Sequence, residues 1–192
     1  MKKNEIDIRT MTVSSILIAV GTVLSFLRIP LSTVTEITLT GLPVAAGAYL
    51  FGPWMGFAIG ALIDVCGFII APKGAFFPGF TISAGLIGMI YGLFLYRNWW
   101  DRESSKKTLL RSGRKGLVIR IVLAHLIKTV CISLCLNCLW LSLFYGLSFP
   151  VVFFASLPKE AVNLPIEVFL IFSIIRLLMR VRPMENTTRD DG

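Results

Sequence analysis

Residues 51–96 decide the fold, and they read FGPWMGFAIGALIDVCGFIIAPKGAFFPGFTISAGLIGMIYGLFLY. They hold two apolar runs, Pro53–Ile70 and Phe80–Tyr96, each close to the about 20 residues that cross the hydrocarbon core of a bilayer. Between the runs stands PKGAFFPGFT, residues 72–81, whose prolines and glycines interrupt a helix. The pattern predicts two membrane helices joined by a tight connection. Turn residues are expected there, but the three phenylalanines need another explanation.

The rest of the chain continues this pattern. It has 192 residues, of which 55% are hydrophobic and 16% charged, whereas soluble domains have about a quarter charged residues. The other apolar segments are about Thr10–Leu27, Ile37–Phe51, Leu117–Leu143 and Leu157–Met179. We therefore predict an all-α integral membrane protein with six transmembrane helices in a single domain, residues 1–183. Residues 184–192 are predicted to be a disordered polar tail.

The charge distribution predicts the orientation. The net charge is +8, and the basic residues gather near the N-terminus, in residues 97–120 and in residues 176–189. Apolar segments separate these clusters, so no continuous basic face is available for nucleic acid. Because basic loops stay on the cytoplasmic side, six crossings place both termini and residues 97–115 in the cytoplasm. The aromatic connection then faces outward.

Small residues recur at helical spacing in both central runs: Gly52, Gly56 and Gly60 in the first, and Gly85, Gly88 and Gly92 in the second. Such spacing lets two membrane helices approach closely, and tight packing is the interpretation we adopt. Asp64 continues the first series. A carboxylate in a membrane helix costs about 2.5–3.5 kcal/mol on insertion scales, so Asp64 should face the bundle interior, in either a structural or a functional role.

Polar and aromatic residues gather toward the predicted outer side: Phe76, Phe77, Phe80, Asn137, Trp140, Lys159, Asn163 and Glu167. The last three are spaced four apart and predict one polar stripe on a helix. Rings beside such a stripe suit a pocket for a flat ligand with polar edges. The alternative is an aromatic belt at the lipid headgroups. We favour the pocket, because a belt needs no rigid prolines and glycines around it.

The sequence lacks the residue patterns for metal binding, nucleophilic catalysis and ATP hydrolysis. Cys131, Cys135 and Cys138 share a helix face but have no fourth ligand, and His125 is the only histidine, so a metal site or a nucleophile–base pair is not predicted. No phosphate-binding loop of the P-loop type is present. We therefore predict no enzyme, no cofactor and no ATP hydrolysis in this chain. A pocket without an energy source implies a partner.

Several separate blocks together resemble the substrate-binding S component of energy-coupling factor (ECF) vitamin transporters, and within that group the folate family. The matching residues are Gly52-Pro53, Asp64, Phe77 to Ala84, Tyr91 to Tyr96, Leu136 to Leu141, and Lys159 with Pro165. The resemblance implies a six-helix bundle in the plasma membrane of a bacterium that captures a vitamin from outside. It also implies a transmembrane coupling subunit and two ATPase subunits as partners.

The resemblance further implies which residues act. The coupling subunit would dock on Ser15 and Ala19, one turn apart in the first helix. The substrate-binding residues would be Lys73, Phe76, Phe77, Phe80, Asn137, Trp140, Lys159 and Asn163, with Asp64 as a buried polar group. Lys73, Lys159 and Arg28 would supply cations for the carboxylates of a folate. Another pteridine or a pyrimidine-type vitamin is an alternative ligand, and a proton-coupled secondary transporter using Asp64 and Lys128 is an alternative function.

Overall fold

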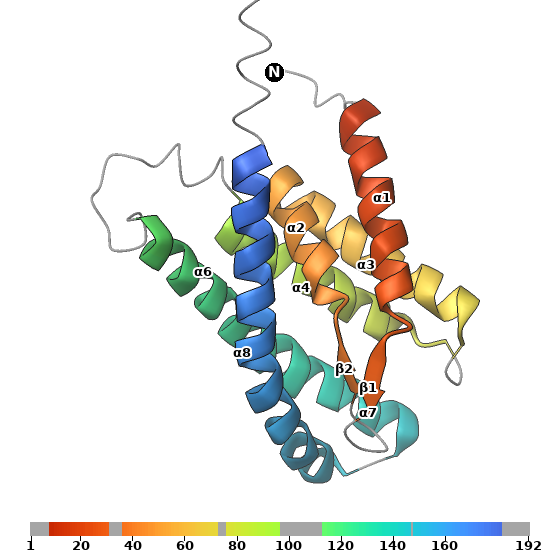
Figure 1. The fold of residues 1–192 in the computed structure, drawn as a ribbon. Helices are drawn as coiled ribbons and strands as arrows, with labels where there is room; N and C mark the ends of the chain where they lie inside the picture. Colours follow the sequence, from red (N-terminus) through yellow and green to blue (C-terminus); the bar gives the residue numbers. More distant parts are fainter. Residues whose placement is uncertain (1–7, 31–35, 73–75, 97–112, 147, 182–192) are drawn as a thin grey trace, which may run out of the picture.

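The computed structural model describes residues 8–30, 36–72, 76–96, 113–146 and 148–181 (Figure 1). Lys73, the predicted polar tail and nearly all of the basic stretch 97–115 lie outside these residues. The helices are α1 (Ile8–Leu24), α2 (Gly41–Phe51), α3 (Pro53–Ile70), α4 (Pro78–Leu95), α6 (Gly113–Lys128), the π-helix η2 (Thr129–Asn137), α7 (Cys138–Tyr145) and α8 (Phe149–Val181). The strands are β1 (Arg28–Pro30) and β2 (Glu36–Thr38).

Helical length and apolarity identify an α-helical integral membrane protein. In the described part of the chain, four segments are long and apolar enough to cross a bilayer: Pro53–Ile70, Pro78–Leu95, Gly116–Phe144 and Glu160–Met179. The helices α1 and α2 are apolar but shorter. The first described turn of α1 and the last of α8 lie at the same end of the bundle (Figure 1).

The helices α3 and α4 pack backbone to backbone along what we call the glycine seam: Gly56 and Gly60 on α3, and Ala84, Gly88 and Gly92 on α4. A Cβ atom on Gly88 would overlap the carbonyl group of Gly56, and one on Gly60 would overlap the carbonyl group of Ala84. A Cβ atom on Gly92 would overlap Pro53 at the start of α3. The predicted close packing is therefore confirmed.

A second group of apolar contacts holds the remaining helices together. Ala48 of α2, Tyr91 of α4, Ile121 of α6 and Ile175 of α8 belong to one buried cluster, and none of these four exposes any measurable surface. The core thus joins helices that are far apart in the chain.

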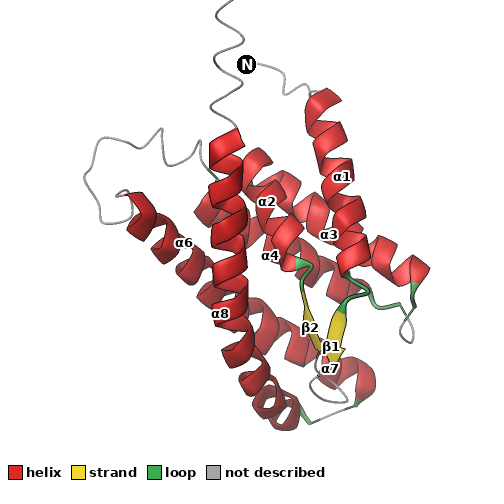
Figure 2. Cartoon of the chain, in the orientation of Figure 1, coloured by secondary structure: helices red, strands yellow, loops and turns green. Residues whose placement is uncertain are grey.

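The connection between α1 and α2 differs from the prediction. The second helix was expected from Ile37, but it begins at Gly41, and residues 36–38 pair antiparallel with residues 28–30. Figure 2 shows this two-stranded sheet extending from the ends of α1 and α2. Ile37 and Thr38 are β-branched, which favours an extended backbone. The strand pairing also supplies partners for backbone groups that a bare loop would leave open.

The last two predicted spans differ as well. The fifth is not one regular helix, because the π-helix η2 separates α6 from α7. The sixth begins at Phe149 and not near Leu157, and both Pro158 and Pro165 stand inside α8. Neighbouring helices can supply the hydrogen bonds that proline removes, so prolines are tolerated within membrane helices.

Candidate functional site

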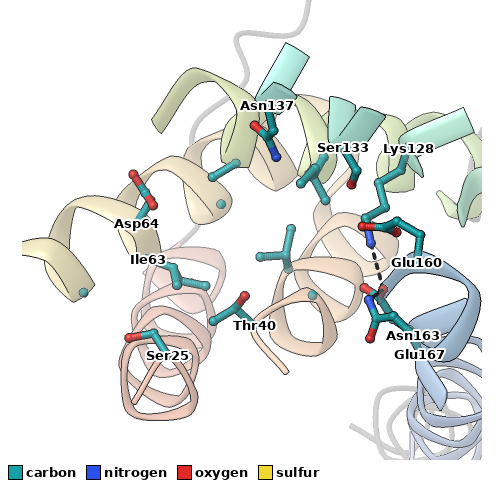
Figure 3. A pocket seen from close by; sticks show the side chains of 16 residues that line it. Ser25, Thr40, Ile63, Asp64, Lys128, Ser133, Asn137, Glu160, Asn163 and Glu167 are labelled. Atoms are coloured by element: carbon teal, nitrogen blue, oxygen red, sulfur yellow. Dashed lines mark hydrogen bonds and ion pairs between the residues drawn. The ribbon is translucent and has the colours of Figure 1, made fainter. Parts of the chain in front are cut away.

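A polar cavity of about 240 Å³ lies among α2, α3, α4, η2 and α8 (Figure 3). Its charged and amide-bearing lining residues are Asp64, Lys128, Asn137, Glu160, Asn163 and Glu167. Ionisable groups inside a membrane bundle are costly and mark ligand or ion pathways. The concentration of such groups around one hollow makes this cavity the candidate functional site.

One carboxylate organises the cavity. Glu167 Oε2 accepts hydrogen bonds from Lys128 Nζ at 2.8 Å and from Asn163 Nδ2 at 3.0 Å. Its other oxygen, Oε1, accepts one from the Tyr91 hydroxyl at 3.0 Å. His125 Nδ1 lies 3.3 Å from Oε2. We call Tyr91, His125, Lys128, Asn163 and Glu167 the carboxylate node.

The carboxylate node ties three helices together and lies against a fourth. Tyr91 comes from α4, Lys128 and His125 from α6, and Asn163 and Glu167 from α8. Gly41 of α2 lies against the same carboxylate, because a Cβ atom there would overlap Glu167 Oε1. The Lys128 and Glu167 side chains are each only 8% exposed. Their opposite charges compensate each other where water is largely excluded.

The two other carboxylates have fewer partners. Asp64 of α3 accepts a hydrogen bond from the Thr81 hydroxyl of α4 at 2.7 Å. Glu160 of α8 accepts one from the Thr129 hydroxyl of η2 at 3.0 Å. Figure 3 shows Glu160 at the same end of the cavity as Lys128 and Asn163, with Asp64 at the opposite end. Acidic groups therefore stand at both ends of the hollow.

An aromatic cluster adjoins the cavity. The ring centroid of Phe77 lies 5.7 Å from that of Phe80, 5.3 Å from that of Trp140 and 5.2 Å from that of Phe144. Trp140 Nε1 donates a hydrogen bond to the Ser83 hydroxyl at 3.2 Å. The cavity lining includes Ala84, next to Ser83, but none of these rings. The cluster thus borders the hollow without filling it.

The structure brings together most of the described candidate residues. Asn137, Asn163 and Asp64 line the cavity, whereas Phe77, Phe80 and Trp140 form the neighbouring cluster. Phe76 stands apart, because it packs on Phe68 with ring centroids 5.1 Å apart and is 46% exposed. Lys73 and the side chain of Lys159 lie outside what the structure describes.

The expected polar stripe is confirmed for Asn163 and Glu167, which hydrogen-bond at the predicted spacing of four. The residues predicted from the sequence to bind substrate do not include Lys128, Glu160 and Glu167. All three line the cavity. The signal that could have found them is the cost of a charge in an apolar segment.

The helix η2 positions part of this lining. Ser133 and Asn137 both face the cavity from it, and π-helical segments often occur at functional sites. Lys128 and Ser133 are five residues apart and would point in different directions on an α-helix. The wider turn of the π-helix brings them to one side.

Ser15 and Ala19 lie on an exposed face of α1. The Ser15 hydroxyl donates to the Met11 carbonyl at 2.9 Å within the helix. Docking on these residues remains a prediction. Among the residues that the structure describes, no group of three or more His, Cys, Asp or Glu side chains is arranged to hold a metal ion.

Apolar spans around an ion-paired cavity define an integral membrane protein with room for a small polar ligand. Residues 9–175 match the family model for the ECF transporter, substrate-specific component. The chain therefore belongs to this family, and it is a transporter component and not an enzyme.

Known relatives agree with the family. A folate transporter FolT of Clostridium novyi (strain NT) is 35% identical over 148 residues, covering 77% of each chain. FolT of Leuconostoc mesenteroides subsp. mesenteroides is 29% identical over 117 residues, covering 59% of this chain and 63% of the relative. A crystal structure of FolT bound with folic acid superposes with a TM-score of 0.70 at 32% identity, covering 86% of this chain and 92% of the other.

Proposed function

We propose that this chain is the folate-binding S component of an ECF transporter. The observation that carries the proposal is the polar cavity, which lies in a chain that matches a folic acid-bound FolT along 86% of its length. In this role the chain captures the vitamin outside the cell, and ATP hydrolysis in partner subunits drives its release inward.

The size of the cavity suits part of a folate. A cavity of about 150 Å³ accommodates benzene, so the about 240 Å³ found here has room for a bicyclic ring system. The glutamate tail would then extend beyond it. This division places the ring among the polar residues of the cavity and the tail carboxylates nearer the surface.

Each candidate residue then has a distinct role. Asn137 and Asn163 hydrogen-bond the ring edges, since both line the cavity. Phe77, Phe80 and Trp140 cover the ring from the neighbouring cluster, and Phe76 encloses the ligand from its separate position against Phe68. Lys73 and Lys159 meet the tail carboxylates. Asp64 stays a buried polar group held by Thr81.

The topology and partners follow the family. Six transmembrane helices place both termini in the cytoplasm, in the plasma membrane of a bacterium. A transmembrane coupling subunit docks on Ser15 and Ala19, and two ATPase subunits bind that coupling subunit. The exposure of both residues on α1 supports this assignment.

Calorimetry tests the ligand and the role of Lys159. Purified wild-type chain should bind folic acid, and Lys159→Ala should weaken binding at least about tenfold, because a charge-assisted hydrogen bond contributes about 1.5–3 kcal/mol. Lys106→Ala, in the basic stretch predicted to face the cytoplasm, is the matched control and should bind as wild type does. Equal affinity in Lys159→Ala would remove this lysine from the site. If the chain binds a pyrimidine-type vitamin or another pteridine tightly and does not bind folate, that compound is the ligand in place of folate.

Reconstituted vesicles test the energy source. Folate should accumulate only when the coupling subunit, both ATPases and ATP are present. Accumulation driven by a pH gradient in vesicles that contain this chain alone would favour the proton-coupled alternative.

A further inference from the structure

Two hydrogen-bond donors of the cavity are already engaged with one carboxylate. Lys128 Nζ and Asn163 Nδ2 both donate to Glu167 Oε2. The charge of Lys128 is compensated by Glu167 at 2.8 Å. A ligand that enters the described cavity therefore meets a cation whose charge is already balanced.

The acceptors are less engaged. Glu160 is 6% exposed, and its one hydrogen bond within the described residues runs from Thr129 to Oε2. Asn137 Oδ1 is buried and has no hydrogen-bond partner among the described residues. A buried acceptor without a partner is costly, so these groups favour a ligand that brings N–H donors.

From these contacts we infer that Glu160 is a specificity-determining residue, which accepts hydrogen bonds from the amino-pyrimidine edge of the ligand. The inference rests on the proposed function and specifies the orientation of the folate ring in the cavity. A carboxylate has two oxygens that can accept two parallel N–H donors. The 2-amino group and the adjacent ring N–H of folic acid form such a pair. The ring then lies with this edge at the end of the cavity where Lys128 and Asn163 also stand (Figure 3).

The position of Glu160 favours it over Asp64 for this role. Glu160 shares its end of the cavity with Asn163 and Lys128 (Figure 3), so neutral and charged polar groups surround the incoming edge. Asp64 stands at the opposite end and is half-buried. Removing the charge from each carboxylate separately therefore distinguishes the two.

Two ligands and three proteins test the inference. The ligands are folic acid and its analogue with an oxo group in place of the 2-amino group. The proteins are the full-length wild type, Glu160→Gln and Asp64→Asn, which removes the charge of the carboxylate at the other end of the cavity. Wild type should prefer folic acid by about 10- to 100-fold, as expected for a hydrogen bond to a charged group. Glu160→Gln should lose most of this preference, and Asp64→Asn should retain it.

The outcomes separate the role of Glu160 from the proposed function. An undiminished preference in Glu160→Gln overturns the role of Glu160, while folic acid binding by wild type still upholds the proposed function. Failure of wild type to bind folic acid overturns both. If Glu160→Gln does not fold, Glu160→Asp keeps the charge, and it should keep the preference at reduced affinity for both ligands. Loss of the preference in Glu160→Asp, with overall affinity unchanged, would also count against the inference.

Discussion

The glycine seam and the carboxylate node join helices by opposite means. At the seam, α3 and α4 touch through backbone atoms, and there is no space for a side chain between Gly56 and Gly88. At the node, α4, α6 and α8 meet through long polar side chains around Glu167. The seam depends on shape and the node depends on charge.

This difference shows how the protein can be rigid and still carry a site. Lipid is as apolar as the side chains facing it, so membrane helices associate through close packing and hydrogen bonds and not through the hydrophobic effect. The seam supplies the close packing over one half of the bundle. The node supplies hydrogen bonds over the other half, and the cavity lies between the two, because Gly60 and Ala84 of the seam and Lys128, Asn163 and Glu167 of the node all line it.

The largest expected effect comes from filling the seam. Gly88→Leu places a side chain where the Gly56 carbonyl already stands, and a backbone cannot move aside as a flexible side chain can. We expect the folded protein to be lost, seen as aggregation in size-exclusion chromatography in detergent. Ala161→Leu adds similar bulk on an exposed face of α8 and should elute as wild type does. Equal behaviour of the two variants would contradict the seam.

The next effect comes from breaking the node. Lys128→Met leaves Glu167 without its compensating cation, which should lower the free energy of unfolding by about 3–5 kcal/mol. The double variant Lys128→Met/Glu167→Gln removes both charges and should be more stable than Lys128→Met alone. Thermal unfolding in detergent measures both. If the two substitutions destabilise additively, Lys128 and Glu167 do not act as a pair.

A smaller effect joins the aromatic cluster to α4. Trp140→Phe removes the indole N–H that donates to Ser83 at 3.2 Å, and it should lower the free energy of unfolding by about 1 kcal/mol. Ser83→Ala breaks the same bond. The double variant should be little worse than the more damaging single variant, because the bond can be lost only once. Full additivity would show that the bond contributes nothing.

The smallest effect is expected at Phe76. Phe76→Leu changes a ring that is 46% exposed and contacts Phe68, so stability should change by no more than about 0.5 kcal/mol. Phe77→Leu removes three ring contacts and should cost more, since aromatic pairs contribute about 0.5–1.5 kcal/mol each. Reversal of this order would place Phe76, and not Phe77, at the centre of the cluster.

Local sequence patterns were enough to predict the seam. The observed α3 spans the same residues, Pro53–Ile70, that its apolar run predicted, and α4 begins at Pro78, two positions before the expected Phe80. Prolines and glycines act on the backbone within one turn, so their effect can be read from neighbouring residues. The spacing of glycines likewise assigns them to one face before any partner is known.

The site could be predicted only in part, because its contacts are not local. Asn163 and Glu167 are four apart on one helix, and their hydrogen bond was foreseeable. Lys128 and Glu167 are 39 residues apart, and their pairing depends on how α6 and α8 lie together. The π-helix and the strand pair are not predicted for a different reason: their backbone hydrogen bonds join residues close in the chain, but no short sequence motif requires them.

The π-helix η2 has a consequence for the whole span that contains it. A π-helix turns less per residue than an α-helix, so α7 is rotated relative to the direction that an uninterrupted helix would give it. On one side of η2, Lys128 reaches α8; on the other, Trp140 reaches α4. A single membrane crossing therefore directs its polar groups toward two different neighbours without a break in the chain.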